Sequence, residues 1–273
     1  MKKYITLLFV IVITLSLMTS CKKDHGDPPA LPPVGSMTID FSNFDSGKKG
    51  DFSISIPKGT QNSNWTLAAS AAMLWNAIIY TSLAVPVYSF QAAVSQKAVY
   101  IDDRTWQWSA DASILNKTYT ARLTGQITAS NVVWKMYITL QGTGGYTDFL
   151  WFEGTSELDG TAGQWKLYES QQNPVEIVKI DWTVTGNTIG TVKYTFTKAG
   201  NIFANSSIEY GLITGVLNAY YTIYYYNAQY QQFFDMNVQW STTLRNGKVK
   251  CLKFFGTSDF YCWDGNYLNV TCQ

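Results

Sequence analysis

The sequence predicts a mainly β protein in which a single antiparallel β-meander, shaped like a half-barrel, packs on one or two N-terminal helices. Three observations carry this prediction. Apolar residues recur at helical spacing near 62–97, apolar and polar residues alternate from Val99 onward, and short turn sequences separate the alternating segments. Strands joined by short turns, with no helices between them, are typical of an antiparallel sheet.

The composition places the chain among globular proteins with a substantial core. It has 273 residues, of which 46% are hydrophobic, 15% aromatic and 14% charged, and this excludes a disordered chain. With 20 basic and 19 acidic side chains the formal net charge is +1, which gives no basis for nucleic-acid binding. Residues 37–273 are predicted to form one domain, because no second linker and no repeat follows Gly35.

Residues 1–20 have the organisation of a secretory signal. A short basic start precedes an apolar run from Ile5 to Met18, which is shorter than a membrane span requires. The run ends in Leu17-Met-Thr-Ser-Cys21, which resembles a bacterial lipobox. This resemblance implies cleavage before Cys21 and attachment of lipid to that residue. The alternative is an ordinary secretory signal followed by an incidental cysteine.

Residues 21–36 are predicted to contain the lipidated cysteine and a Pro-rich tether that holds the folded part away from the membrane. Four of the 7 prolines lie here, without a helical or strand pattern. With Met37-Thr-Ile-Asp-Phe41 after the tether and Cys262-Trp-Asp and Cys272 near the end, the chain resembles an uncharacterised family of Bacteroidota lipoproteins. The resemblance implies a cell-envelope protein, anchored in the outer membrane, and implies no activity. Two locations of the folded part, the periplasm and the cell surface, stay open as alternatives.

The helical pattern covers residues near 62–97. Asn62 is a residue type favoured at helix caps, and Trp65, Ala72 and Ile79 are among the apolar residues that share one face. Pro86 interrupts the pattern, so we expect it to begin a second helix. A transmembrane segment is the alternative for such an apolar stretch, but its asparagines and proline favour helices that lie against a sheet.

From Val99 to the C-terminus the period changes to two, which predicts roughly ten strands. Turn sequences such as Gly186-Asn187 and Asn246-Gly247 separate them. The order of the elements, helix first and meander afterwards, resembles the lipoprotein-carrier folds of the periplasm. A closed lipocalin-like barrel is the alternative architecture.

Ten tryptophans and 18 tyrosines suggest a surface that binds a sugar or a partner, because aromatic faces stack on apolar sugar faces. Trp106 and Trp108 share a face without aliphatic companions and are candidate contact residues. The strand-like alternation assigns several other tryptophans to apolar faces and therefore to the core. These are Trp134, Trp165, Trp182 and Trp240.

The segment 220–226 is aromatic on both of its predicted strand faces. Tyr221, Ile223 and Tyr225 continue the core face. Tyr220, Tyr224 and Tyr226 lie on the opposite face and are candidate ligand contacts. The alternative is that the tether or a long loop covers this face.

Catalytic and metal-binding arrangements find little support in the sequence. The single histidine, His25, lies in the tether, so a Ser-His-Asp triad and a His-based metal site are both excluded from the folded part. Glu153, Glu157 and Asp159 are carboxylates that a hydrolase could use as acid and base. We found no nucleotide-binding motif. We therefore expect no enzyme activity, no cofactor and no metal.

Three cysteines follow Cys21, and an exported protein can keep a disulfide between two of them. If Gly256-Thr257 forms a two-residue hairpin loop, Cys251 faces Cys262. The other pair, Cys262 with Cys272, needs a wider chain reversal, and the family-like ending favours it. Both pairs stay open at this point.

The predicted function is that of a non-enzymatic, lipid-anchored envelope protein whose β-sheet surface binds a ligand or partner. One alternative is a carrier that holds a lipid or other apolar ligand between helices and sheet. Another is a hydrolase that uses carboxylates alone. The expected partners are the membrane, through the lipid anchor, and a glycan, a lipid or a protein as ligand.

Overall fold

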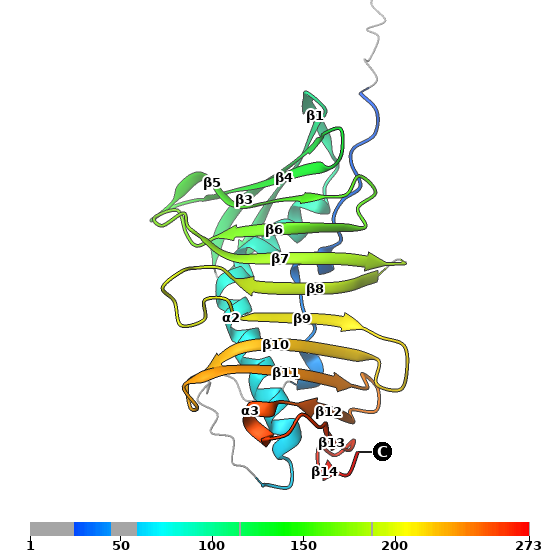
Figure 1. Cartoon of the computed structure of the whole chain (residues 1–273). Helices are drawn as coiled ribbons and strands as arrows, with labels where there is room; N and C mark the ends of the chain where they lie inside the picture. Colours follow the sequence, from blue (N-terminus) through cyan, green and yellow to red (C-terminus); the bar gives the residue numbers. More distant parts are fainter. Residues whose placement is uncertain (1–24, 45–58, 115, 187, 273) are drawn as a thin grey trace, which may run out of the picture.

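The fold is a single antiparallel sheet of 14 strands, in which the strands lie side by side in sequence order (Figure 1). The structure is a computed structural model, and it describes residues 25–44, 59–114, 116–186 and 188–272. The first and last strands form the two edges and do not pair with each other, so the sheet is open. The predicted meander is confirmed, and the alternative of a closed barrel is wrong. The strands are β1 (Val99–Asp102), β2 (Thr105–Ile114), β3 (Lys117–Ile127), β4 (Val132–Leu140), β5 (Tyr146–Ser156), β6 (Ala162–Tyr168), β7 (Glu176–Thr185), β8 (Thr188–Phe196), β9 (Ser207–Leu212), β10 (Ala219–Asn227), β11 (Gln232–Trp240), β12 (Gly247–Lys250), β13 (Tyr261–Trp263) and β14 (Asn269–Val270).

Helix α2 (Ser63–Val94) runs across the strands on one face of the sheet, called the inner face here (Figure 1). Helix α2 is long and apolar enough to cross a membrane. In this structure it packs against strands at both ends of the sheet. It continues through Pro86, so the prediction of a second helix there is wrong. An internal proline costs about 3 kcal/mol, and Pro86 is one of the buried residues of this helix, as are Leu83 and Phe90. The remaining described helices are η1 (Val34–Met37), η2 (Ser42–Phe44) and α3 (Leu252–Phe255).

Residues 25–44 also cross the inner face. The prediction of a free tether over 21–36 is wrong for its described part, because Pro32 and Ser36 are buried. The indole Nε1 of Trp165 donates a hydrogen bond to Ser36 Oγ at 3.1 Å, and this bond is buried. The N-terminal segment is therefore part of the domain.

The core lies between the sheet and the segments on its inner face. The four tryptophans predicted to be buried are at most 2% exposed, which confirms their assignment. Four core tryptophans each lie over a glycine of the neighbouring strand, where a Cβ atom would come within 2.5 Å of the ring. These pairs are Gly125–Trp134, Gly154–Trp165, Gly163–Trp182 and Gly247–Trp263.

The C-terminal strands are joined by a disulfide between Cys262 and Cys272, whose Cα atoms are 5.2 Å apart. Cys251 is buried and is not part of this disulfide. The hairpin predicted at Gly256-Thr257 is wrong, because α3 occupies the connection between β12 and β13. The pairing of these strands places Lys248, and not Cys251, opposite Cys262. Of the two pairs left open by the sequence, the structure contains the second.

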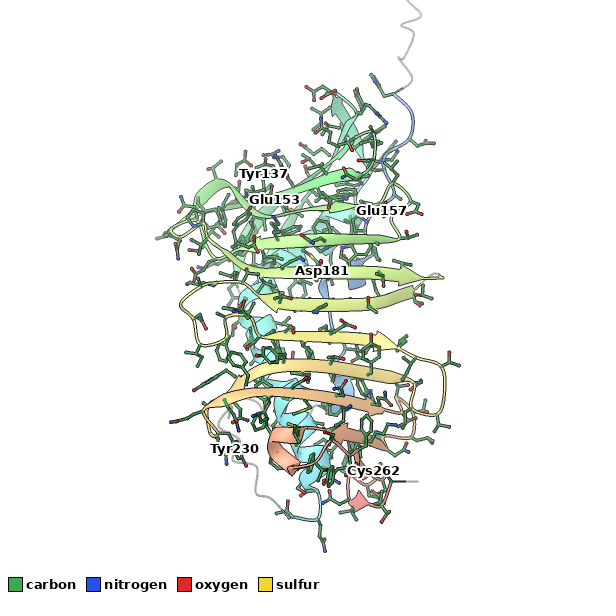
Figure 2. The ribbon with its side chains drawn as sticks, in the orientation of Figure 1. Tyr137, Glu153, Glu157, Asp181, Tyr230 and Cys262 are labelled. Atoms are coloured by element: carbon green, nitrogen blue, oxygen red, sulfur yellow. A yellow bond between two sulfur atoms is a disulfide. The ribbon has the colours of Figure 1, made fainter. Side chains whose placement is uncertain are left out.

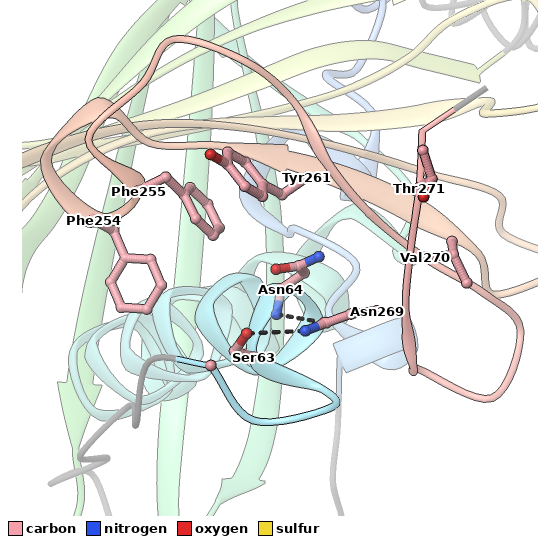
Figure 3. Close-up of a pocket in the computed structure, with 9 residues that line it drawn as sticks. Ser63, Asn64, Phe254, Phe255, Tyr261, Asn269, Val270 and Thr271 are labelled. Atoms are coloured by element: carbon pink, nitrogen blue, oxygen red, sulfur yellow. Dashed lines mark hydrogen bonds between the residues drawn. The ribbon is translucent and has the colours of Figure 1, made fainter.

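The β13–β14 hairpin also caps the N-terminus of α2 (Figure 3). Asn269 Oδ1 accepts a hydrogen bond from the backbone N–H of Asn64 at 3.1 Å, and Asn269 Nδ2 donates to the carbonyl oxygen of Thr60 at 2.8 Å. Asn62 occupies the N-cap position, but its side chain makes no capping hydrogen bond. A residue distant in sequence therefore satisfies one of the backbone N–H donors that a helix start leaves unpaired, and it also bonds to the carbonyl of the residue Thr60 before the helix.

Candidate functional site

The tyrosine-rich strand β10 presents aromatic side chains on both faces of the sheet, as the sequence predicts. Tyr220, Tyr224 and Tyr226 lie on the outer face, which is the face opposite α2. Tyr224 is 40% exposed, and the other two are partly buried. On the inner face lie the buried side chains of Tyr221, Ile223 and Tyr225.

The outer aromatic residues of β10 combine with one residue of β11. The rings of Tyr224 and Phe233 are stacked, with centroids 4.8 Å apart and an interplanar angle of 10°. Tyr226 meets the same Phe233 ring at 5.5 Å and 71°, in an edge-on contact. We call these three residues the aromatic platform. Its rings are held by each other, so their orientation is preorganised before any ligand arrives.

Polar groups lie beside the aromatic platform. Asp235 on β11 and Ser207 on β9 pair with Tyr224 across the sheet, and the carboxylate of Asp235 is exposed. Further along β10, the Tyr220 hydroxyl donates a hydrogen bond to Glu209 Oε1 at 2.8 Å. Burial, together with this hydrogen bond and the charge of Glu209, raises the pKa of Tyr220 to about 12. Tyr220 is therefore neutral at physiological pH and acts as a hydrogen-bond donor.

Phe233 is the member of the platform that sequence reasoning missed. The alternation that assigns Phe234 to the core implies that Phe233 faces outward, so its side of the sheet could have been recognised. The contact between Phe233 and Tyr224 could not have been recognised from the sequence, because this contact depends on the strand register, in which Tyr226 pairs with Phe233. Register is set by the turn between the strands and by packing across them.

Trp106 and Trp108, predicted as contact residues, lie in the core and are only 9% and 2% exposed. Trp106 packs edge-on against Tyr100 at 5.3 Å, and Trp108 contacts Trp134 at 5.7 Å. Their companions come from other strands and from α2, so the absence of aliphatic neighbours within β2 was misleading. Cys21, the predicted site of lipid attachment, lies outside the described residues.

The carboxylates proposed for a hydrolase do not converge (Figure 2). Glu153 lies within β5 and accepts a hydrogen bond from the Tyr168 hydroxyl at 2.7 Å, whereas Glu157 follows the end of that strand. Glu157 belongs to the turn after β5, where its carbonyl oxygen accepts a hydrogen bond from the backbone N–H of Gly160 at 3.0 Å. Hydrogen bonds from Thr161 lower the pKa of Asp159, which is the opposite of what a general acid needs.

The space between α2 and the middle of the sheet is filled by side chains. Phe90 of α2 meets Phe152 at 6.1 Å and Trp165 at 5.6 Å, and all three are buried. Two grooves of about 520 Å³ and 680 Å³ lie at the other end of the molecule, around the β13–β14 hairpin. The first is lined by the start of α2, α3 and the C-terminal residues (Figure 3). Neither groove is the helix–sheet cavity that a carrier of an apolar ligand requires.

Among the described residues there is no group of three or more His, Cys, Asp or Glu side chains that could hold a metal ion. Comparisons of the chain with protein-family models, with curated proteins and with solved structures give no match.

Proposed function

We propose that this protein is a lipid-anchored component of the bacterial cell envelope that binds a glycan through the aromatic platform on the outer face of β10 and β11. The observation that carries the binding proposal is the partly exposed, stacked pair of Tyr224 and Phe233. The lipobox-like sequence ending in Cys21 supports the anchor, and the resemblance to Bacteroidota lipoproteins supports attachment at the outer membrane.

The chemistry of the platform suits a carbohydrate. Aromatic rings on a sheet surface offer their faces and edges to the apolar face of a sugar ring. The exposed carboxylate of Asp235, with the polar side chains of Ser207 and Asn237 on neighbouring positions, can accept and donate hydrogen bonds to sugar hydroxyls. A purely apolar ligand would leave these polar groups without partners and would be disfavoured.

Binding can be tested by affinity electrophoresis against a panel of polysaccharides. Loss of one aromatic contact costs about 0.5–1.5 kcal/mol, so Tyr224→Ala and Phe233→Ala should each weaken binding by about 3- to 10-fold. Tyr224→Phe keeps the ring and should retain most of the affinity. Tyr88→Ala removes an exposed tyrosine of α2 and serves as the control.

Unchanged binding by both alanine variants, with their folding verified by thermal unfolding, would refute the platform as the binding site. The anchor is tested separately by metabolic labelling with a fatty acid. Wild-type protein should carry the label and sediment with membranes, and Cys21→Ser should lose both properties. Membrane sedimentation of Cys21→Ser would contradict the proposed anchor.

A further inference from the structure

The position of His25 limits where the proposed lipid anchor can lie. Its imidazole ring stacks on Tyr100 of β1, with ring centroids 3.8 Å apart. Cys21 precedes His25 by four residues, and an extended chain spans at most about 3.6 Å per residue. Whatever conformation the intervening residues adopt, the Cα atom of Cys21 lies within about 14 Å of the Cα atom of His25, and His25 is in side-chain contact with β1.

The N-terminal segment ties this end of the chain to the whole length of the sheet (Figure 1). In the middle of the sheet Ser36 bonds to Trp165, as described above. Further along, the Tyr221 hydroxyl donates to the carbonyl oxygen of Asp40. At the far end the ring of Phe44 meets Trp240 at 4.9 Å. The segment cannot swing away from the sheet without breaking buried contacts, so the anchor stays at the β1 end.

The β1 edge exposes apolar side chains close to this point. Val99 and Ile101 of this strand are 62% and 47% exposed. Within the described chain β1 pairs only with β2. The exposed charged residues Lys97, Asp102, Asp103 and Arg104 flank these two side chains, so this edge suits the polar headgroup level of a bilayer and not its hydrocarbon interior.

We propose that the β1 end of the sheet rests on the bilayer, with Val99 and Ile101 at the lipid interface, and that the sheet holds the aromatic platform away from the membrane. This inference rests on the lipid anchor proposed above. Neighbouring strands lie about 4.8 Å apart. The nine strand spacings from β1 to β10 therefore place the platform about 43 Å along the sheet, and the thirteen spacings to β14 place that edge about 62 Å away.

The orientation can be measured by energy transfer in vesicles that contain the full lipidated chain and a lipid with an acceptor dye on its headgroup. A donor dye is attached to the thiol introduced by Ile101→Cys in one sample and by Leu268→Cys in the other. The replaced side chains are matched in exposure, at 47% and 44%, and Leu268 directly precedes β14. The native cysteines do not compete for the dye, because Cys251 is buried and Cys262 is bonded to Cys272.

We expect transfer from position 101 to be at least about fivefold more efficient than from position 268, because position 101 lies on β1 next to the anchored end, whereas position 268 precedes β14, about 62 Å from β1 along the sheet. Equal or reversed efficiencies in vesicle-bound protein would overturn the orientation and leave the anchor intact. Protein that fails to float with the vesicles would refute the anchor and this inference together. In the unlipidated Cys21→Ser protein without detergent, a dye at position 101 that is shielded from a water-soluble quencher would show that a second copy covers the edge, and would also overturn the proposal.

Discussion

The substitution Gly125→Ala tests whether the tryptophans of the core require glycine on the neighbouring strand. Gly125 lies on β3 directly opposite Trp134 on β4. A Cβ atom at position 125 would lie 2.5 Å from Cζ3 of the indole, whereas ordinary carbon contacts are about 3.5–4.0 Å. The ring would therefore have to move by about 1 Å.

The core gives Trp134 little freedom to move. The side chain is 0% exposed, and its Nε1 donates a hydrogen bond to Ser156 Oγ at 2.9 Å. Overpacking of this kind costs about 1–3 kcal/mol, and replacing glycine within a strand returns about 0.5–1 kcal/mol. We expect Gly125→Ala to lower the free energy of unfolding by about 1–2 kcal/mol.

A double-mutant cycle measured by urea denaturation isolates this contact. Trp134→Phe removes the indole atoms that approach position 125, so in that background Gly125→Ala should be neutral or stabilising. The reasoning would be refuted if Gly125→Ala cost the same in both backgrounds, or if it cost nothing in the wild-type protein.

Three further predictions concern the helix cap, pH and the disulfide. Asn269→Ala should destabilise the protein by about 1–2 kcal/mol in urea denaturation, because its hydrogen bonds to Asn64 and Thr60 at the start of α2 are lost. The control Asn266→Ala, in the same hairpin, should have no effect. Equal effects of the two substitutions would contradict the capping role of Asn269. Burial raises the pKa of Tyr220 and Tyr225 to about 12 in the folded protein, so these tyrosines ionise at lower pH in the unfolded chain. The free energy of unfolding should therefore be independent of these two groups below about pH 10 and should fall as the pH rises toward 12. Denaturation midpoints that stay constant over this range would oppose that expectation. Non-reducing peptide mass spectrometry should find the last two cysteines linked and the thiol of Cys251 unmodified, and a linked Cys251 would disprove the assignment.

Period-two alternation was enough to predict the architecture and the two faces of β10. For Tyr221 and Tyr224, the face of the sheet follows from the alternation within their own strand, and the predicted faces are confirmed. Trp106 was misassigned because its neighbours come from other elements. The two-residue hairpin loop expected at Gly256-Thr257 is absent because the four preceding residues form α3. Local turn propensity does not predict this short helix.

The N-terminal segment shows the same limit at a larger scale. Four prolines and few apolar residues over 21–36 are typical of a spacer, and no periodic signal marks Ser36 as buried. Its burial depends on Trp165, which is 129 residues away in sequence. Tertiary contacts of this kind are invisible to any argument that examines one segment at a time.

This segment and α2 together have a functional consequence. Both lie on the inner face, where Phe90, Trp165 and Phe44 fill the space that a half-barrel could otherwise offer to a ligand. The aromatic platform lies on the opposite, outer face, where Tyr224 is 40% exposed and reachable from solvent. Since the N-terminal segment also places His25 beside β1, the same contacts that fill the interior would determine how far from the membrane the proposed anchor holds the platform. Weakening them, for example by Ser36→Ala, should therefore loosen the orientation of the anchored protein before it alters the platform itself.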